Sequence, residues 1–261
     1  MPAIVTLLTD FGLADTYVGQ LKGAVLGVAP TVSLVDLTHQ VPAQAVEVGA
    51  FLLWSAVAVF PAGSVHLAVV DPGVGSARRA VAARAGRGDL FVGPDNGLLV
   101  PALERLGGVA AAVELTEPRY WRPQPSTTFH GRDLFGPVAG HLASGVPLRE
   151  LGQPVTLGRP FALPAPSVSA HAVTGTVLHV DAYGTLVTSI PAELLTAGYV
   201  VHLAGHEVAP AATYQAVAPG ALLALVGSAG LLEVAARDAS AAALLGVDRG
   251  TPVRVEPGAL R

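Results

Sequence analysis

Short apolar strands alternate with helical runs along the first half of the chain, and this alternation restricts the possible folds more than any other feature. Strands are predicted at residues 4–9, 32–37 and 65–70, with helices near 17–27 and over 45–59. Strands separated by helices need crossover connections, which join neighbours in a parallel sheet. The run Leu67-Ala68-Val69-Val70 is apolar on both faces, as in a strand covered on both sides. The first half therefore predicts an α/β domain with a largely parallel central sheet.

The pattern changes between Pro160 and Ser169, where closely spaced prolines disfavour both a helix and a central strand. We expect an α/β domain over residues 1–160, a proline-rich linker over 161–170 and a smaller domain over 171–261. Short strand-like runs with frequent turns follow the linker, at residues 175–180, 186–190, 199–203, 221–226 and 253–255. This second pattern is typical of a small β-barrel.

Composition excludes several classes of protein. The chain has 261 residues, of which 51% are hydrophobic, so it can bury a substantial core. Charged residues make up only 13%, and the net charge of -4 gives no basic field for a phosphate backbone, so we expect no nucleic-acid partner. Cysteine is absent, which excludes disulfides, thiolate metal sites and cysteine nucleophiles and is compatible with a reducing cytoplasm. A cytoplasmic location is the prediction.

No membrane partner is expected either. The longest apolar stretch, residues 50–60, contains Ser55 and ends at Pro61, well short of the roughly 20 residues that a bilayer span requires. We interpret it as a buried helix. The first residues lack a basic segment before an apolar one, so no signal peptide is predicted.

Acidic side chains follow the predicted strands directly. Open parallel sheets bind ligands at the carboxyl ends of their strands, so Asp10 and Asp71 are candidate site residues. Asp10 could accept hydrogen bonds from ribose hydroxyls, or it could serve as a helix cap or turn residue. Asp71 is followed seven and eight residues later by Arg78 and Arg79, which suggests either a functional pair or a salt bridge that closes a turn.

Three further candidates lie later in the sequence, and the first of them, His130, could be a third partner of Asp71 and Arg78. His130 is flanked by small residues and could exchange a proton near neutral pH, although a structural, hydrogen-bonded histidine fits the same pattern. In the second half, Asp181 and Tyr183 end a predicted strand, where an ordinary hairpin turn is the alternative.

His202 and His206 have a spacing that suits a metal only on a helix. Their glycine-broken surroundings predict no helix, so no metal site is expected.

Several motifs, in order along nearly the whole chain, resemble the S-adenosylmethionine (SAM) hydroxide adenosyltransferase family, whose relatives are the SAM-dependent fluorinase and chlorinase. These motifs are Thr9-Asp10-Phe11-Gly12, Val70-Asp71-Pro72-Gly73-Val74-Gly75, Gly93-Pro94-Asp95-Asn96-Gly97, Phe129-His130-Gly131-Arg132-Asp133 and residues 227–235. The resemblance implies an α/β domain, a β-barrel domain, and a homotrimer with SAM sites between one subunit's N-terminal domain and its neighbour's C-terminal domain. SAM is then the substrate, and no cofactor is expected.

The resemblance also implies roles for individual residues. The family's Asp, Arg and His triad falls on Asp71, Arg78 and His130, since the family arginine lies seven residues after the aspartate. The substrate-binding residues that follow from the resemblance and from the strand-end pattern are Asp10 for the ribose hydroxyls, Asp181 for the methionine amino group, Ser228 for its carboxylate, Tyr183 beside them, and the backbone up to Asp238 for adenine. Thr185 and Ser189 stand where the family usually has asparagine.

The predicted activity is hydrolysis of SAM to adenosine and methionine by attack of activated water at the ribose C5′ carbon. We expect Arg78 to stabilise hydroxide, Asp71 to hold its two partners, and His130 or a linked water to accept the proton. The alternatives are a halide adenosyltransferase and a non-catalytic SAM or adenosine binding protein. In the halogenating relatives the positions of Asp71 and His130 are occupied by other residue types, and a carboxylate repels halide, so this chain resembles a user of water.

Overall fold

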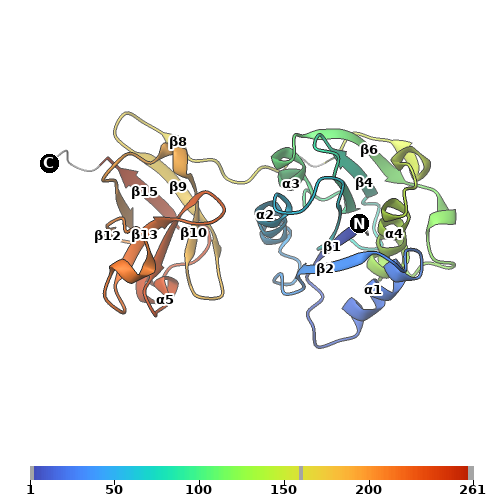
Figure 1. Cartoon of the computed structure of the whole chain (residues 1–261), viewed down its shortest axis with the longest axis horizontal. Helices are drawn as coiled ribbons and strands as arrows, with labels where there is room; N and C mark the ends of the chain where they lie inside the picture. Colours follow the sequence, from blue (N-terminus) through green and yellow to red (C-terminus); the bar gives the residue numbers. More distant parts are fainter. Residues whose placement is uncertain (1–2, 159–160, 258–261) are drawn as a thin grey trace. The chain divides into compact units, whose positions relative to one another are not determined.

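The computed structural model describes residues 3–158 and 161–257, which form two compact units that divide between Phe161 and Ala162 (Figure 1). The predicted domain boundary begins at Pro160, which lies outside the described residues, as do the first two residues of the chain. None of the helices in the described ranges is both long enough and apolar enough to span a membrane.

A seven-stranded sheet forms the centre of the first unit, in the order β2-β1-β3-β5-β4-β6-β7. Its strands are β1 (Ile4–Thr9), β2 (Ser33–Thr38), β3 (Val65–Val69), β4 (Ala80–Ala85), β5 (Leu90–Pro94), β6 (Val109–Leu115) and β7 (Gly152–Pro154). The pairs β2-β1, β1-β3 and β3-β5 are parallel, and the pairs made by β4, β6 and β7 are antiparallel.

The prediction of a largely parallel sheet is therefore only partly right. Between residues 80 and 94 the chain contains no helix, and β4 returns directly into β5 through the short connection 86–89. A connection this short can join only antiparallel strands, because a parallel pair requires a crossover of a dozen or more residues. The alternation that governs the first three strands thus ends at β3, and the sheet is mixed.

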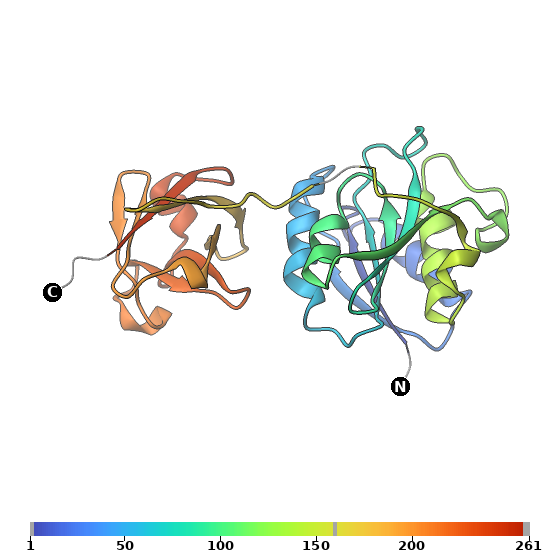
Figure 2. The same cartoon turned by 90° about the horizontal axis from the view of Figure 1, so that it is seen from above.

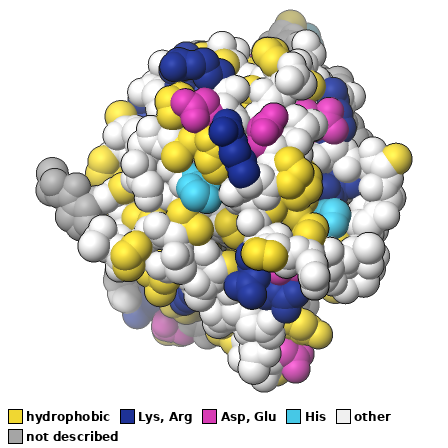
Figure 3. All heavy atoms as spheres, turned by 90° about the vertical axis from the view of Figure 1, so that its right-hand side faces the viewer, with side chains coloured by type: hydrophobic (Ala, Val, Ile, Leu, Met, Phe, Trp, Pro, Cys, Tyr) yellow, Lys and Arg dark blue, Asp and Glu magenta, His cyan; other side chains and the backbone are white. Residues whose placement is uncertain are grey.

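Helices cover both faces of this sheet (Figures 1 and 2). On one face lie α1 (Tyr17–Leu26) and α4 (Gly136–Ala143), and on the other lie α2 (Val46–Val57) and α3 (Val100–Arg105). Each pair packs its apolar side chains against the sheet, so the unit has two buried layers that share the sheet between them. Residues 50–60, predicted as a buried helix, fall largely in α2. On the face drawn in Figure 3, basic and acidic side chains are interspersed and form no single basic area.

The second unit is a nearly closed, barrel-like antiparallel sheet, which agrees with the predicted small barrel. Its strands are β8 (Ser167–Val168), β9 (Val173–Val180), β10 (Leu186–Pro191), β11 (Val200–Leu203), β12 (His206–Val208), β13 (Leu222–Val226), β14 (Leu231–Ala236) and β15 (Pro252–Glu256). A bridge between Pro210 and Ala224 brings the segment after β12 to β13, so the two ends of the sheet approach each other. Inward-facing aliphatic residues and the short helix α5 (Ala241–Leu245) complete its core.

Single-turn helical segments complete the inventory: η1 (Pro118–Tyr120), η2 (Gly131–Phe135), η3 (Leu148–Glu150), η4 (Ala192–Leu194) and η5 (Tyr214–Ala216). Of these, η2 has π-helical geometry and leads directly into α4. Such π turns within helices often occur at functional sites.

Stability should depend on pH through His66, a fully buried residue of β3. Its Nδ1 atom lies 2.8 Å from Thr6 Oγ1, its Nε2 atom lies 3.5 Å from Asp89 Oδ1, and burial lowers the pKa of His66 to about 4. The unfolded chain takes up a proton at this histidine near pH 6.5 while the folded chain does not, so folding stability falls as the pH falls from about 6.5 to about 4.

A His66→Gln variant removes this titration, and its stability should approach that of the parental protein as the pH falls through that range. Urea unfolding at several pH values from 7 to 4.5 measures the difference between the two proteins. A difference independent of pH would contradict the assignment.

Candidate active site

Three side chains from two distant stretches of the chain meet at the carboxyl edge of β3. Arg78 Nε donates to both carboxylate oxygens of Asp71, at 2.9 and 3.0 Å, and Arg78 Nη2 donates to Oδ2 as well. The same Nη2 atom lies 2.8 Å from His130 Nδ1. Arg78 is therefore the central member of the group and joins the carboxylate to the imidazole.

The loop between β3 and β4 returns Arg78 to Asp71 through successive turns. Val74 N donates to Asp71 O and Ser76 N donates to Gly73 O, while the hydroxyl of Ser76 accepts from Arg78 N at 3.2 Å. Gly75 has φ +76°, a conformation that favours glycine, and a Cβ atom there would lie 2.5 Å from the carbonyl oxygen of Thr127. The loop after β3 thus packs backbone to backbone against the loop that carries His130.

His130 immediately precedes η2 and is held in its neutral form. Burial, followed by the positive charge of Arg78, lowers the pKa of this imidazole. Because Arg78 can only donate, Nδ1 must accept, and the proton of the neutral ring is then on Nε2. His130 in this arrangement offers a hydrogen-bond donor, and its acceptor nitrogen is already occupied.

A cavity of about 300 Å³ lies beside the group and is lined by Asp71 and His130 but not by Arg78. Asp10, at the end of β1, lines the same cavity, as the parallel strand ends predicted. Its Oδ2 atom accepts a hydrogen bond of 2.9 Å from the backbone N of Gln44, which has the unusual φ of +66° for a residue other than glycine. The Asp10 carboxylate is thereby oriented at the wall of the cavity.

The other predicted binding residues share a larger pocket of about 900 Å³ in the barrel unit. Asp181, Tyr183, Ser228 and Asp238 all line it. Asp181 Oδ1 accepts hydrogen bonds from the backbone N of Tyr183 at 2.9 Å and of Thr185 at 2.8 Å, so the β9-β10 turn orients this carboxylate. Asp181 and Tyr183 therefore lie in a hairpin turn, and this turn lines the pocket.

The sequence interpretation missed Glu233, which lines this pocket from β14. Burial, and then the nearby Asp181 carboxylate, raise the pKa of Glu233. A Cβ atom at Gly227 would lie 1.8 Å from Glu233 Oε1, so the Glu233 side chain would have to move to accommodate one. One sequence signal could have identified Glu233: it is a carboxylate within an apolar strand, inside the motif at residues 227–235. Three carboxylates, those of Asp181, Glu233 and Asp238, line the pocket beside one guanidinium, that of Arg237, and this excess of acidic groups suits a cationic ligand group.

The two departures from the usual family asparagines lie in different environments. Thr185 lines the barrel pocket, so its side chain can affect a ligand there. Ser189 is buried, and its Oγ atom accepts a hydrogen bond of 3.0 Å from Thr176 N inside the barrel. We therefore expect Thr185, and not Ser189, to alter ligand contacts.

Metal ligation finds no support in the described part of the chain, where no group of three or more His, Asp or Glu side chains could hold an ion. His202 lies on β11 and His206 on β12, with no helix beneath them. His202 instead approaches Glu207 and Glu256, at 3.9 and 3.7 Å.

Comparison with known proteins matches both units. Residues 5–152 match the model of the SAM hydroxide adenosyltransferase N-terminal domain, and residues 175–254 match that of the C-terminal domain. The chain is 45% identical to the (R)-S-adenosyl-L-methionine hydrolase of Salinispora arenicola, over 97% of this chain and 98% of that protein. It is 43% identical to the hydrolase of the same name from Thermus thermophilus, over 96% and 98%.

More distant similarity extends to halogenating enzymes and to solved structures. The fluorinase of Nocardia brasiliensis is 29% identical, over 98% of this chain and 97% of that protein. The crystal structure of an uncharacterised conserved protein from Thermotoga maritima superposes with a TM-score of 0.92 at 34% identity, over 97% of this chain and all of that chain.

Proposed function

We infer that this chain, which belongs to the SAM hydroxide adenosyltransferase family, hydrolyses (R)-S-adenosyl-L-methionine to adenosine and L-methionine. The observation that carries this conclusion is the Asp71-Arg78-His130 group, two members of which line a cavity that also contains Asp10. Hydrolases at 43–46% identity support it, and the fluorinases are more distant, at 28–31%.

The substrate determines what the site must supply. The water oxygen forms a bond to C5′ of the ribose, the C5′–S bond breaks, and its electron pair stays on sulfur as the neutral thioether of methionine. Because a thioether needs no proton to leave, no general acid is required at sulfur. One proton is released from the attacking water, so the site needs an acceptor for it and a geometry that aligns oxygen, carbon and sulfur.

We place the proton acceptor at Asp71, whereas the sequence favoured His130 or a linked water. The neutral His130 ring could accept a proton only at Nδ1, and this would break the contact with Arg78 and put two cations side by side. A carboxylate has about four acceptor positions, and Arg78 uses three on Asp71, one on Oδ1 and two on Oδ2. A weak base is sufficient, since water becomes strongly acidic as its bond to carbon forms.

The remaining roles follow from charge and position. Arg78 fixes Asp71 and His130 relative to each other, and His130 Nε2–H donates to the oxygen that attacks. We propose that Asp10 binds the ribose hydroxyls, that Asp181 and Glu233 bind the methionine ammonium group, and that Ser228 binds its carboxylate. Tyr183 and the backbone up to Asp238 complete the pocket for adenine and the amino acid.

The homotrimer with sites between subunits stays a prediction, which analytical sedimentation tests. The cytoplasmic location also stays a prediction.

Incubation of the purified protein with SAM in ¹⁸O-labelled water tests the function. Mass spectrometry of the product should find the heavy oxygen in adenosine and none in methionine. The Asp71→Ala/Arg78→Ala/His130→Ala variant is the control, and it should bind SAM but form adenosine far more slowly. Binding without product over hours by the parental protein would instead favour the non-catalytic alternative.

The halide alternative is tested in the same assay. Chloride or fluoride added to the reaction should yield no 5′-halo-5′-deoxyadenosine, because the Asp71 carboxylate repels an anion in the cavity that it lines. A halogenated nucleoside formed in proportion to halide concentration would overturn the hydrolase assignment.

Glu233→Gln should have opposite effects on stability and on binding. The folded state raises the pKa of Glu233, so ionisation of this residue as the pH rises opposes folding, and the neutral amide should make the free protein more stable at neutral pH. The same change removes a charge that pairs with the substrate ammonium, so the KM for SAM should rise. Thermal unfolding without ligand and steady-state kinetics measure the two effects. A variant less stable at neutral pH and unchanged in KM would refute this role for Glu233.

A further inference from the structure

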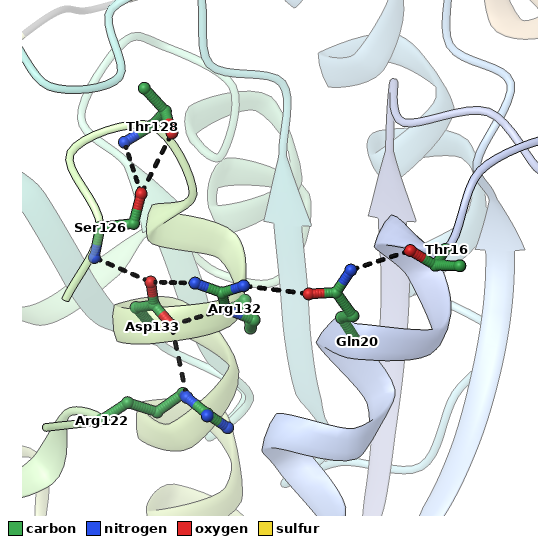
Figure 4. A network of polar contacts seen from close by, with 7 residues as sticks. All are labelled: Thr16, Gln20, Arg122, Ser126, Thr128, Arg132 and Asp133. Atoms are coloured by element: carbon green, nitrogen blue, oxygen red, sulfur yellow. Dashed lines mark hydrogen bonds and ion pairs between the residues drawn. The ribbon is translucent and has the colours of Figure 1, made fainter. Parts of the chain in front are cut away.

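Asp133, three residues after His130, is almost completely buried and is the centre of a polar network (Figure 4). Its Oδ2 atom accepts from Ser126 N at 2.9 Å and from Arg132 Nη2 at 2.8 Å, and its Oδ1 atom accepts from Arg132 Nε at 2.7 Å. Arg122 Nε lies 3.4 Å from Oδ1. None of these groups lines the cavity, so the triad chemistry leaves the network without an assigned role.

The network closes the chain segment that carries His130. The side chain of Asp133 holds the start of this segment through Ser126 N, and the backbone N of Asp133 donates to Phe129 O at 3.1 Å near its end. The backbone O of Asp133 accepts from Arg122 N at 2.9 Å. Residues 126 and 129 are therefore both tied to Asp133, and His130 lies between Phe129 and Asp133 in the sequence.

A second branch of the network attaches this segment to α1. Arg132 Nη1 donates to Gln20 Oε1 at 3.0 Å, and Gln20 Nε2 donates to Thr16 Oγ1 at 2.9 Å (Figure 4). The guanidinium of Arg132 also lies 5.0 Å from the centre of the Phe129 ring. The Asp133–Arg132 pair thus fixes the segment to a helix that packs on the central sheet.

On its other side the segment touches the loop of Asp71 and Arg78. The carbonyl oxygen of Thr127 leaves no room for a side chain at Gly75, as described above. A displacement of residues 126–128 would therefore move both the loop after β3 and the imidazole of His130. The contact between Arg78 Nη2 and His130 Nδ1, at 2.8 Å, tolerates little of either movement.

We propose that Asp133 is a positioning residue of the hydrolase: through Ser126 N and Arg132 it holds His130 against Arg78. This proposal rests on the function inferred above. It differs from a purely stabilising role in that loss of Asp133 should lower kcat by tenfold or more while the folded fraction and the KM for SAM change little. The KM should be preserved because the proposed substrate contacts lie on Asp10 and in the barrel pocket.

The test compares Asp133→Asn with Arg122→Gln. The asparagine keeps the shape of the side chain but loses the charge that holds the fork of Arg132. Arg122→Gln removes a partner of Asp133 whose side chain is 52% exposed and should leave kcat within about twofold, as for exposed ion pairs in general. If Asp133→Asn does not fold, Arg132→Lys replaces it, since lysine keeps the charge without the two-pronged contact, and kcat should then fall several-fold.

A measurement independent of activity separates this proposal from the proposed function. In ¹⁵N spectra of the histidine rings of the full chain, with the His130 signal identified by a His130→Gln variant, the parental protein should show Nδ1 as acceptor and Nε2 protonated. Asp133→Asn should shift this signal toward that of a solvent-exposed, mixed tautomer, whereas Arg122→Gln should not.

The outcomes are distinct. Parental protein that makes no adenosine refutes the hydrolase assignment, and the His130 spectrum then still tests the positioning. An unchanged His130 spectrum in Asp133→Asn, or a loss of kcat that only matches the loss of folded protein, overturns the positioning role.

Discussion

Arg78→Met is expected to lower the turnover of SAM by about 10²–10⁴-fold, the range seen when one positioned group of a proton-transfer or charge-stabilising site is removed. Arg78 contacts both Asp71 and His130, so its loss separates two side chains that line the same cavity. Methionine preserves much of the side-chain volume next to Phe135, over whose ring the guanidinium lies at 5.2 Å. Single-turnover kinetics with the enzyme in saturating excess over SAM measures the chemical step directly.

Arg79→Met is the matched control, because Arg79 is the adjacent arginine and has its own carboxylate partner, Asp95. Its turnover should stay within a few-fold of the parental value. Arg78→Lys retains the charge opposite the buried Asp71 carboxylate, so it tests geometry without leaving that charge unpaired. Full activity in Arg78→Lys, or equal losses in the Arg78 and Arg79 variants, would contradict the bridging role.

The sequence was sufficient for the features that depend on local pattern. The apolar runs of β1 and β3 and the polar residues that end them follow from periodicity, and they place Asp10 and Asp71 at one edge of the sheet. Local sequence pattern could not predict that β4 runs antiparallel to its neighbours. Strand direction depends on how the chain connects, and the short turn at residues 86–89 is recognisable only once both flanking strands are known.

The site was predictable only in part, for a related reason. Residue type and spacing cannot show that His130 lies 2.8 Å from Arg78, 52 residues away, and here the resemblance to a family supplied the pairing. Glu233 was missed because a carboxylate inside an apolar strand is usually turned to solvent, whereas here it faces a pocket with Asp181. Asp133 was noticed only as part of a motif, since its role depends on backbone groups that carry no sequence signal.

Gly75→Ala should lower turnover strongly although it adds only one methyl group. The added Cβ atom would lie 2.5 Å from Thr127 O, so the two loops of the triad must move apart, and alanine is in addition strained at φ +76°. A displacement of about 1 Å in a catalytic group can cost about 10²-fold in rate, and we expect a loss of turnover of this order. Steady-state kinetics and circular dichroism on the same preparation separate lost activity from lost folding.

Gly63→Ala isolates the cause of that loss. Gly63 has a similar φ of +83°, with no atom within 4 Å of an added Cβ, and it lies before β3, at the opposite end of the strand from Asp71. It therefore carries the same backbone strain, about 1 kcal/mol of stability, without the clash between loops. If both alanine variants lose activity equally, backbone strain and not loop contact explains the effect. If Gly75→Ala alone is inactive but folded, the close approach of the two loops is what holds Arg78 and His130 together, and the triad is then a property of loop packing as much as of its three side chains.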